Sequence, residues 1–355
     1  MSVGYTWVQW SPHKRLYDGL MAGAALAYIG IFFGVTRLLW TGVNAYSDEI
    51  VLIRATGSCA LILLHVILCI GPLARLDRRF LPLLYNRRHL GVMTFLVALV
   101  HATFVLGFYH GFGVVNPFLS LLTSNTNYSS LRAFPFQILG LGALIIMFVM
   151  AATSHDFWLK NLSAATWKRL HMLVYVAYAL LIGHVALGAI QSDRSTFAPI
   201  LLFGGVLTVT SLHLLAGLRE VRKDAGTAPL ATADQQWIDV GTPDDIPEDR
   251  ARTVCTPCGE RIAVFKHARA ISAVTNVCAH QGGPLGEGKV IDGCITCPWH
   301  GWQYRPQDGR SPPPFEEKIA TYQVRIVSGR VQVNPNPLPP GTPIAPAQIA
   351  ETIHA

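Results

Sequence analysis

Two cysteine–histidine pairs lie close together in the stretch Asn276–Tyr304, NVCAHQGGPLGEGKVIDGCITCPWHGWQY. One residue separates Cys278 from His280, two separate Cys297 from His300, and sixteen lie between the pairs. A structural zinc site commonly takes two cysteines from one short loop and two histidines from another. Here each loop supplies one thiolate and one imidazole. This pattern favours a two-iron cluster with both thiolates on one iron and both imidazoles on the other.

The spacing resembles that of a Rieske [2Fe–2S] domain, over about 100 residues of the chain. Ser311–Phe315, SPPPF, resembles the proline loop that covers the cluster in such domains. The resemblance implies four iron ligands, Cys278, His280, Cys297 and His300. A zinc ion on the same four residues is the alternative.

The residues around these ligands also bear on the reduction potential. Rieske proteins of the cytochrome bc type carry an extra, disulfide-bonded cysteine in each loop and a serine that hydrogen-bonds a sulfide. Gly283, Trp299 and Trp302 occupy the corresponding positions, and only the tyrosine position, Tyr304, matches. Fewer hydrogen bonds to a cluster imply a lower potential. We therefore expect a low-potential, ferredoxin-type Rieske domain.

A second set of candidate ligands lies in the apolar first part of the chain. Its long hydrophobic runs, or their edges, contain six histidines: His65, His89, His101, His171, His184 and His213. An ionisable side chain inside a bilayer is costly and commonly marks a functional site. A single such histidine is more simply explained by a hydrogen bond at a helix contact. Six of them beside an iron–sulfur domain favour haem ligation.

Spacing sorts four of these histidines into two levels. His101 follows His89 by twelve residues, and His184 follows His171 by thirteen. At 1.5 Å per residue, each step rises roughly 18–20 Å along a helix. Two parallel helices would then carry an inner pair and an outer pair, each able to hold a haem between two imidazoles. Haem iron ligated on both sides suits electron transfer.

The same segments resemble a known family. RRHLGVMTFLVALVHATFVL and WKRLHMLVYVAYALLIGHVAL are similar to the third and fifth spans of the ferric reductase-like transmembrane superfamily. By motif, the nearest member is the haem membrane subunit of bacterial methionine sulfoxide reductase. This resemblance implies His101, His171 and His184 as haem ligands. The fourth ligand stays open between His89 and His65, because the position of His89 is usually apolar in that subunit.

The amino-acid composition indicates which kind of element positions these histidines. Only 14% of the 355 residues are charged, whereas a soluble protein has about 25%. Six apolar runs are long enough to cross a bilayer, which takes roughly 20 residues. They lie near residues 19–41, 51–72, 90–111, 134–153, 170–190 and 197–217. The sequence therefore predicts an all-α bundle of six transmembrane helices.

Basic residues in the connecting loops predict the orientation of this bundle. One side collects Lys14, Arg15, Arg75, Arg78, Arg79, Arg87, Arg88, Lys160, Lys168, Arg169, Arg219, Arg222 and Lys223, and the other side only Arg132 and Arg194. Both termini should therefore be cytoplasmic, in an inner (cytoplasmic) membrane. The net charge of +7 reflects this bias, so we expect no nucleic-acid partner. The opposite-side loop, 111–133, contains TSNTNYSS and is predicted to be polar.

The rest of the chain reads as a small all-β domain. Short strand-like runs separated by turn residues include RIAVFKH, AISAVTNV, KVIDGCITC, TYQVRIVSG and RVQVNP. We therefore divide the chain into a transmembrane domain (1–218), a linker (219–235), a Rieske domain (236–335) and an extended Pro-rich tail (336–355).

Three further cysteines accompany the domain. Cys255 and Cys258 form a C-x-x-C that is either a redox pair or second metal site, or simply two thiols in a turn. Cys294 is expected to be a buried strand residue. Cytoplasmic thiols stay reduced, so disulfides are not expected.

These features together predict a membrane-bound oxidoreductase subunit with a Rieske cluster and one or two b-type haems. It would pass single electrons between a cytoplasmic donor, a reductase or ferredoxin, and an extracytoplasmic acceptor. The chain carries neither a Gly-rich nucleotide-binding fingerprint nor a flavin domain, so hydride must be handled elsewhere. Quinone chemistry in the membrane, or a sensor or assembly protein whose cluster regulates a partner, are the alternatives.

Overall fold

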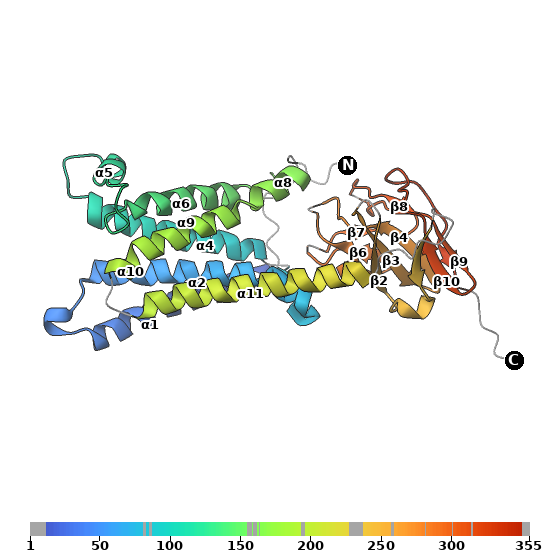
Figure 1. Cartoon of the computed structure of the whole chain (residues 1–355), viewed down its shortest axis with the longest axis horizontal. Helices are drawn as coiled ribbons and strands as arrows, with labels where there is room; N and C mark the ends of the chain where they lie inside the picture. The colour runs from blue at the N-terminus through green and yellow to red at the C-terminus, as the bar shows by residue number, and fades with distance from the viewer. Residues whose placement is uncertain are drawn as a thin grey trace. The chain divides into compact units, whose positions relative to one another are not determined.

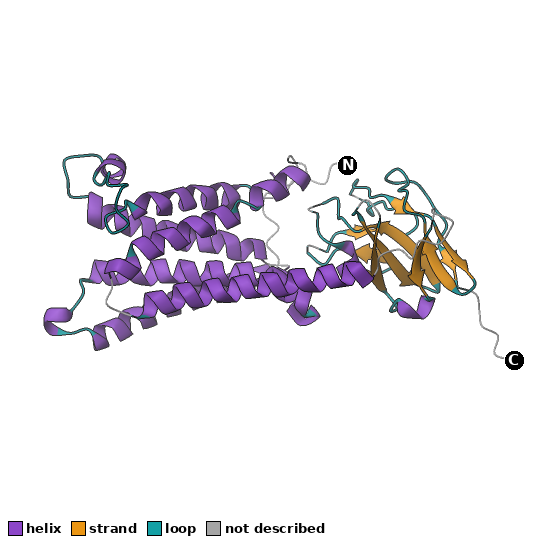
Figure 2. Cartoon of the chain, viewed as in Figure 1, coloured by secondary structure: helices purple, strands orange, loops and turns teal. Residues whose placement is uncertain are grey.

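The structure is a computed structural model. It describes residues 12–80, 83–84, 87–154, 158, 162, 164–192, 196–226, 237–256, 259–280, 282–299, 301–313 and 315–349. The chain divides into two compact units, a helical unit that ends at Leu215 and a β unit that begins at Ala216. Figure 2 shows helices in the first and strands in the second.

Helices of different lengths make up the helical unit (Figure 1). In chain order they are α1 (Pro12–Leu39), α2 (Asp48–Leu76), α4 (Arg87–Val105), α5 (Pro117–Thr123), α6 (Phe136–Ala152), α8 (Ala164–His171), α9 (Val174–Leu187), α10 (Ala189–Ser192) and α11 (Phe197–Gly226). Short 3₁₀ turns lie at Gly42–Asn44 and Arg78–Phe80, and α4 continues as a π-helix over Leu106–His110.

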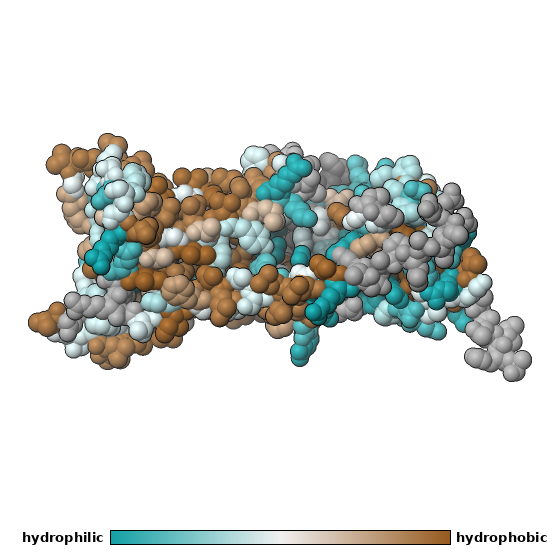
Figure 3. Space-filling model, in the orientation of Figure 1, coloured by the Kyte–Doolittle hydropathy of each residue, from teal (hydrophilic) through white to brown (hydrophobic). Residues whose placement is uncertain are grey.

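Within the described residues, five helical stretches are long and apolar enough to cross a membrane. They are Arg15–Leu39, Asp48–Leu76, Arg87–His110, Thr166–Gln191 and Phe197–Arg222. The fourth predicted span, 134–153, is represented by the shorter α6 of 17 residues. Since roughly 17 residues is the lower limit for a membrane helix, the sixth crossing stays a prediction. Figure 3 shows hydrophobic side chains over the surface of these helices.

Two helix pairs form the centre of the helical unit. α2 packs along α4, α6 packs along α9, and α4 joins the pairs through its contact with α6. Small apolar clusters fill the contacts, such as the one around Phe95, Ala143 and Ala177. Packing through small residues allows membrane helices to approach closely. The helices that carry His101 and His184 are therefore held together by their neighbours.

Three antiparallel sheets build the β unit. One contains β1 (Ile238–Gly241), β10 (Arg330–Val333) and β9 (Val324–Val327). A second contains β11 (Ala347–Gln348), β4 (Ala270–Thr275), β3 (Arg261–His267) and β2 (Arg250–Cys255), with β8 (Thr321–Tyr322) also paired to β4. The third contains β5 (Lys289–Ile291), β6 (Cys294–Thr296) and β7 (Gln303–Tyr304). The prediction of a small all-β domain is confirmed.

The third sheet positions the cysteine–histidine loops. The first loop lies between β4 and β5, and the second joins β6 to β7. Val290, Ile295 and Tyr304 from this sheet are buried with Phe265 of β3 in one apolar cluster. The loops therefore start from strands anchored in a common core.

The structure differs from the predicted linker and tail. α11 continues to Gly226, so the first part of the predicted linker is helical. The Pro-rich tail is extended, yet Ala347 and Gln348 pair with β4 as β11. Ile349 packs against the apolar core of the first two sheets. Up to this residue, the described tail is part of the β unit.

Candidate metal centres

The first cysteine–histidine loop is closed by two backbone hydrogen bonds. The N–H of Cys278 donates to the carbonyl oxygen of Gly283 at 2.9 Å, and the N–H of Gly282 donates to that of Cys278 at 2.7 Å. Gly282 has φ +72°, a left-handed conformation that favours glycine. Gly282 and Gly283, which follow the predicted ligand His280, therefore supply the tight turn.

The second loop repeats this geometry. The N–H of Cys297 donates to the carbonyl oxygen of Trp302 at 2.7 Å, and the N–H of Gly301 donates to that of Cys297 at 3.0 Å. Gly301 has φ +71°. The two loops thus present their cysteines in the same backbone setting, as expected for two halves of one cluster site.

Both cysteine side chains are almost fully buried. Cys278 is 1% exposed and Cys297 2% exposed, and both belong to the apolar cluster around the third sheet. A Cβ built on Gly283 would lie 2.7 Å from the Sγ of Cys297. This close approach excludes a side chain at Gly283, where the cytochrome bc type has its extra cysteine. Because both thiols are buried and free of a disulfide, they can serve as ligands to one iron.

Tyr304 lies directly beside the first thiol. Its hydroxyl is 3.3 Å from the Sγ of Cys278, and the whole side chain is buried. Burial, followed by the neighbouring Cys278, raises the pKa of Tyr304 far above its ordinary value. The hydroxyl therefore stays protonated and can donate a hydrogen bond to a thiolate. Such a bond stabilises negative charge at the sulfur.

A stack of aromatic rings covers the histidine side of the first loop. The imidazole of His280 and the indole of Trp302 lie face to face, with centroids 4.1 Å apart and planes 3° apart. The indole N–H donates to the Oγ of Ser311 at 3.1 Å, and the ring also contacts Phe315 at 4.3 Å. Trp302 therefore connects the imidazole of His280, a predicted ligand, to the SPPPF loop. The fourth predicted ligand, His300, lies outside the described residues.

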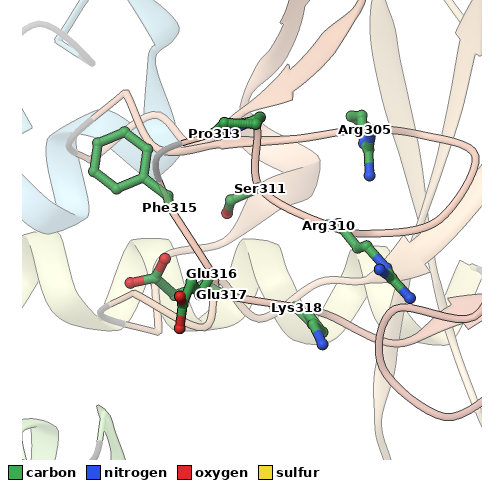
Figure 4. Close-up of a pocket in the computed structure, with 8 residues that line it drawn as sticks. All are labelled: Arg305, Arg310, Ser311, Pro313, Phe315, Glu316, Glu317 and Lys318. Carbon is green, nitrogen blue, oxygen red and sulfur yellow. The ribbon is translucent and has the colours of Figure 1, made fainter. Parts of the chain in front are cut away.

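A small pocket opens beside the SPPPF loop (Figure 4). Its volume is about 420 Å³, and its lining residues are Arg305, Arg310, Ser311, Pro313, Phe315, Glu316, Glu317 and Lys318. Arg305 is paired with Asp308, and Arg310 donates to the carbonyl oxygen of Gly341. Both signs of charge are present, so the pocket shows no preference for an anion or a cation.

The β unit contains three further cysteines, Cys255, Cys258 and Cys294. Cys255 ends β2 and is half-buried, while Cys258 lies outside the described residues, so the role of this C-x-x-C stays open. Cys294 is a half-buried residue of β6. Burial raises the pKa of the Cys294 thiol, which keeps it protonated.

In the helical unit, the structure brings two of the predicted histidines together. The ring centroids of His101 on α4 and His184 on α9 are 6.4 Å apart. Two metal–imidazole bonds of about 2.0 Å each, in line, would separate the centroids of the rings by about 6 Å. The spacing therefore fits a metal ion held between the two imidazoles.

Both rings are oriented by hydrogen bonds and by glycines. The Nδ1 of His101 donates to the carbonyl oxygen of Ile53, and that of His184 donates to the carbonyl oxygen of Phe136, each at 2.9 Å. A Cβ on Gly57 would lie 2.9 Å from the ring of His101, and one on Gly140 would lie 2.8 Å from the ring of His184. Ligating histidines typically donate through the second ring nitrogen in this way, which leaves Nε2 for a metal.

His171 and His89 are also bonded through Nδ1. The Nδ1 of His171 donates to the carbonyl oxygen of Trp167 at 3.0 Å, and Trp167 stacks on the imidazole at 3.8 Å. The Nε2 of His171 lies 3.4 Å from the Oγ of Ser154. His89 contacts the carboxylate of Asp18 on α1 at 2.9 Å. No contact in the described residues joins His89 to His171, so the structure does not assemble an inner pair as it does the outer one.

His65 and His213 have different surroundings. His65 is 7% exposed, and its Nε2 has no hydrogen-bond partner among the described residues. The tip of its ring touches Gly205 of α11. His213 uses both nitrogens within the protein, on the carbonyl oxygen of Val209 at 2.8 Å and on the hydroxyl of Tyr175 at 3.1 Å.

Sequence reasoning missed the residues that orient these rings. Asp18 lies 71 positions from His89, and the glycines Gly57, Gly140 and Gly205 lie on other helices than the histidines they touch. Glycine in a membrane helix is a signal of close packing, yet it does not say which side chain packs there.

Comparison with known proteins agrees with both halves of this arrangement. Residues 56–182 match the family model described as ferric reductase like transmembrane component, and residues 236–323 match the Rieske [2Fe–2S] domain. The helices and loops thus define a membrane electron-transfer protein. The chain belongs to the ferric reductase-like transmembrane family and carries a Rieske [2Fe–2S] domain.

Individual relatives divide between the two halves. The protein-methionine-sulfoxide reductase heme-binding subunit MsrQ of Herminiimonas arsenicoxydans is 32% identical over 201 residues, covering 57% of this chain and 85% of that protein. Its counterpart in Caulobacter vibrioides is 28% identical, covering 56% and 88%. The anthranilate 1,2-dioxygenase ferredoxin subunit of Burkholderia cepacia is 34% identical over 101 residues, covering 28% and 92%. These relatives are similar to separate halves of this chain.

Proposed function

We propose that the protein passes single electrons across a membrane, from a Rieske cluster in the cytoplasm to haem in the bilayer. The 6.4 Å separation of the His101 and His184 rings carries this proposal. It is supported by the similarity of the helical unit to heme-binding subunits. Both cofactors change oxidation state by one electron, so the protein needs neither hydride chemistry nor a catalytic base.

His101 and His184 hold the outer haem in this proposal. Their Nδ1 hydrogen bonds to Ile53 and Phe136 fix each ring with Nε2 directed away from its own carbonyl partner. Donation through Nδ1 also makes the imidazole a better ligand. Gly57 and Gly140 leave room for the rings at the helix contacts. These contacts hold the imidazoles in place before and after each electron arrives.

His171 holds the inner haem, and the hydrogen bonds favour His89 over His65 as its partner. Asp18 provides the carboxylate–histidine contact that commonly supports a metal ligand. His65 lacks such a contact among the described residues, and an iron at its Nε2 would require α11 to move away from the ring. The twelve-residue step from His89 to His101 is also only one residue shorter than the step from His171 to His184.

Two alternatives remain from the sequence. A lipid-soluble quinone could exchange electrons with the haems from within the bilayer, which would replace an aqueous partner on one side. A sensor or assembly protein would use the cluster to regulate a partner without passing electrons to haem. Neither is favoured by a specific contact in the described residues.

A reconstituted system tests the proposal. Protein in sealed vesicles is exposed to photoreduced flavin mononucleotide on the side of the β unit, and haem reduction is followed by its α-band. We expect rapid haem reduction in the wild type and little in Cys278→Ser, which cannot hold the cluster. Equal haem reduction in both proteins would show that electrons bypass the cluster. A cluster that is reduced while the haem stays oxidised would favour the sensor.

A further inference from the structure

Exposed apolar side chains gather in the segment between α4 and α6. We call residues 111–131 the α5 loop, because they surround α5. Its exposed residues include Phe112, Val114, Val115, Phe118, Leu119 and Leu122. Val114 is fully exposed and Phe112 is 90% exposed. Figure 3 shows hydrophobic atoms over this end of the helical unit. The predicted polar loop is therefore polar only in its second half, TSNTNYSS.

Charge is missing from the α5 loop. Its sequence, GFGVVNPFLSLLTSNTNYSSL, contains no Asp, Glu, Lys or Arg, and Arg132 follows it directly. A surface that recognises a protein partner usually places charged or polar groups around its apolar centre. The exposed side chains in the first half of the α5 loop are hydrocarbon apart from the amide of Asn116, which caps α5. This composition suits lipid better than a water-soluble protein.

Internal contacts fix which way α5 faces. The Oδ1 of Asn116 accepts a hydrogen bond from the backbone N–H of Phe118 at 3.0 Å and caps the helix, with Pro117 in its first turn. The side of α5 that faces the protein carries Ser120 and Leu121. The Oγ of Ser120 lies 2.9 Å from the Nδ1 of the buried His110, and Leu121 is 8% exposed. His110 ends the π-helix that extends α4. The apolar face is thus held outward at the end of a membrane helix.

Aromatic and apolar residues recur at the same end of the helical unit. The turn after α1 contains Trp40 and Tyr46, whose ring centroids are 5.5 Å apart, and between them Val43 is fully exposed. Figure 1 places this turn and α5 at one end of the helices. Trp and Tyr are enriched where a membrane meets water. The turn after α1 and the α5 loop therefore both have the composition of a membrane interface.

We propose that α5 and its preceding turn lie in the headgroup–acyl boundary of the lipid bilayer, with TSNTNYSS in water. The occupant of the exposed apolar face is lipid. A helix with an apolar face binds this boundary by burying that face, without crossing the membrane. The His110–Ser120 contact sets its depth, because it ties α5 to the end of α4. The α5 loop then lies in the boundary at the end of α4, the helix that carries His101.

Site-resolved thiol labelling tests the proposal. Leu119→Cys and its matched control Asn127→Cys, both at exposed positions, are made in the full chain. Each protein is placed in phosphatidylcholine nanodiscs, one chain per disc, and reacted with a membrane-impermeant maleimide. Proteolytic peptides report the labelled position, so native cysteines do not interfere. Labelling of Leu119→Cys should be about tenfold or more slower, because a thiol in hydrocarbon resists ionisation. The rates should become equal in denaturant.

Other outcomes identify other occupants. Equal rates in the nanodiscs would overturn the proposal. Protection of Leu119→Cys in cell membranes but not in nanodiscs would assign the face to a protein partner and would also overturn it. Leu122→Cys provides a second probe if Leu119→Cys fails to fold. Replacing part of the lipid with phosphatidylglycerol should leave the labelling rates unchanged. Protection of Leu119→Cys only in the presence of this anionic lipid would contradict binding through the apolar face of α5. Nanodiscs are open on both faces, so the result does not depend on orientation.

Discussion

Tyr304 and Trp302 contact two of the predicted cluster ligands in different ways. Tyr304 reaches the Sγ of Cys278 with its hydroxyl, whereas Trp302 lies flat on the imidazole of His280. The hydroxyl can donate a hydrogen bond to the sulfur, and the indole covers one face of the imidazole. Hydrogen bonding and solvent exposure are both known to tune the potential of an iron–sulfur cluster. The two residues should therefore shift it in different directions when they are replaced.

Replacing Tyr304 with phenylalanine should lower the cluster midpoint potential. The variant keeps the ring and removes the hydrogen bond that stabilises the more negative, reduced state. A net hydrogen bond is worth about 1 kcal/mol, and a one-electron tenfold change is 59 mV, so the shift should be about 40 mV. Potentiometric titration followed by EPR measures it. An unchanged or higher midpoint would show that the contact with Cys278 does not matter.

Replacing Trp302 with leucine should raise the midpoint, because water then reaches His280 and favours the more charged, reduced cluster. Two further variants separate the ring from its N–H group. Trp302→Phe keeps a ring to stack on the imidazole, and Ser311→Ala removes the acceptor of the indole N–H bond. If stacking excludes the water, Trp302→Phe stays close to the wild type. If anchoring of the SPPPF loop matters instead, Trp302→Phe and Ser311→Ala shift together.

At the scale of elements, helix contacts position the predicted haem ligands His101 and His184. Gly140 on α6 and Gly57 on α2 each touch a histidine of the neighbouring helix, within the two pairs that pack most closely. In the β unit, β1 and β10 are joined by an ion pair as well as by their backbone ladder. The glycine–histidine contacts and the Asp239–Arg330 ion pair all join residues that are far apart in the chain.

Gly140→Ala should disturb haem binding without touching a ligand. The new Cβ would lie 2.8 Å from the ring of His184, closer than such atoms approach, so the ring must rotate or the helices must separate. We expect a partial loss of the haem α-band or a high-spin signal, as in His184→Ala but weaker. Gly142→Ala is the control, since its Cβ would meet the side chain of Leu180 at an ordinary 3.4 Å. Identical spectra for both variants would contradict this role of Gly140.

Asp239 and Arg330 should stabilise the β unit in a pH-dependent way. The Nε of Arg330 donates to both oxygens of Asp239 at 3.0 and 3.1 Å and lowers the pKa of that carboxyl. The stabilisation is therefore present above the unfolded pKa and is lost as pH falls through the lower folded value. Asp239→Asn should cost up to about 1 kcal/mol at pH 7 and progressively less below about pH 4. Denaturant unfolding of the wild type and the variant at pH 7 and below pH 4 measures the difference in their free energies of unfolding. A difference that does not change with pH would refute this prediction.

For the whole molecule, the direction of electron flow depends on the order of potentials. The cluster should have the lowest potential, because Gly283, Trp299 and Trp302 replace the groups that raise it in cytochrome bc-type proteins. We therefore expect both haems to titrate above the cluster, with electrons leaving on the side opposite the β unit. A cluster midpoint more than about 100 mV above both haems would favour the reverse flow, since 59 mV is a tenfold preference.

The position of the α5 loop relative to the cytoplasm is a separate prediction. Because basic residues collect in the other loops, a reporter inserted near Asn125 should be active only in its exported form, and one after Ala355 only in its cytoplasmic form. The opposite pattern would move the β unit outside and reverse the proposed route.

Much of this organisation could be predicted from local sequence. The run RIAVFKH predicts the strand found at Arg261–His267, because its β-branched and aromatic residues and the turn residues around it act within one segment. The two cysteine–histidine loops are recognisable by spacing alone, since a cluster needs its ligands at short, fixed intervals. The family of the helical unit was predicted from two segments and is confirmed. Long apolar runs predict membrane helices because the bilayer acts on each helix separately.

Only the tertiary structure decided which distant residues meet. It joined Asp18 to His89, placed glycines against three of the histidines, and paired the Pro-rich tail with β4. It also turned the apolar face of α5 outward through His110 and Ser120. None of these contacts produces a periodic pattern in the sequence, because each depends on how separate elements approach one another. Hydrophobic pattern specifies which elements form, whereas the packing between them specifies which side chains touch.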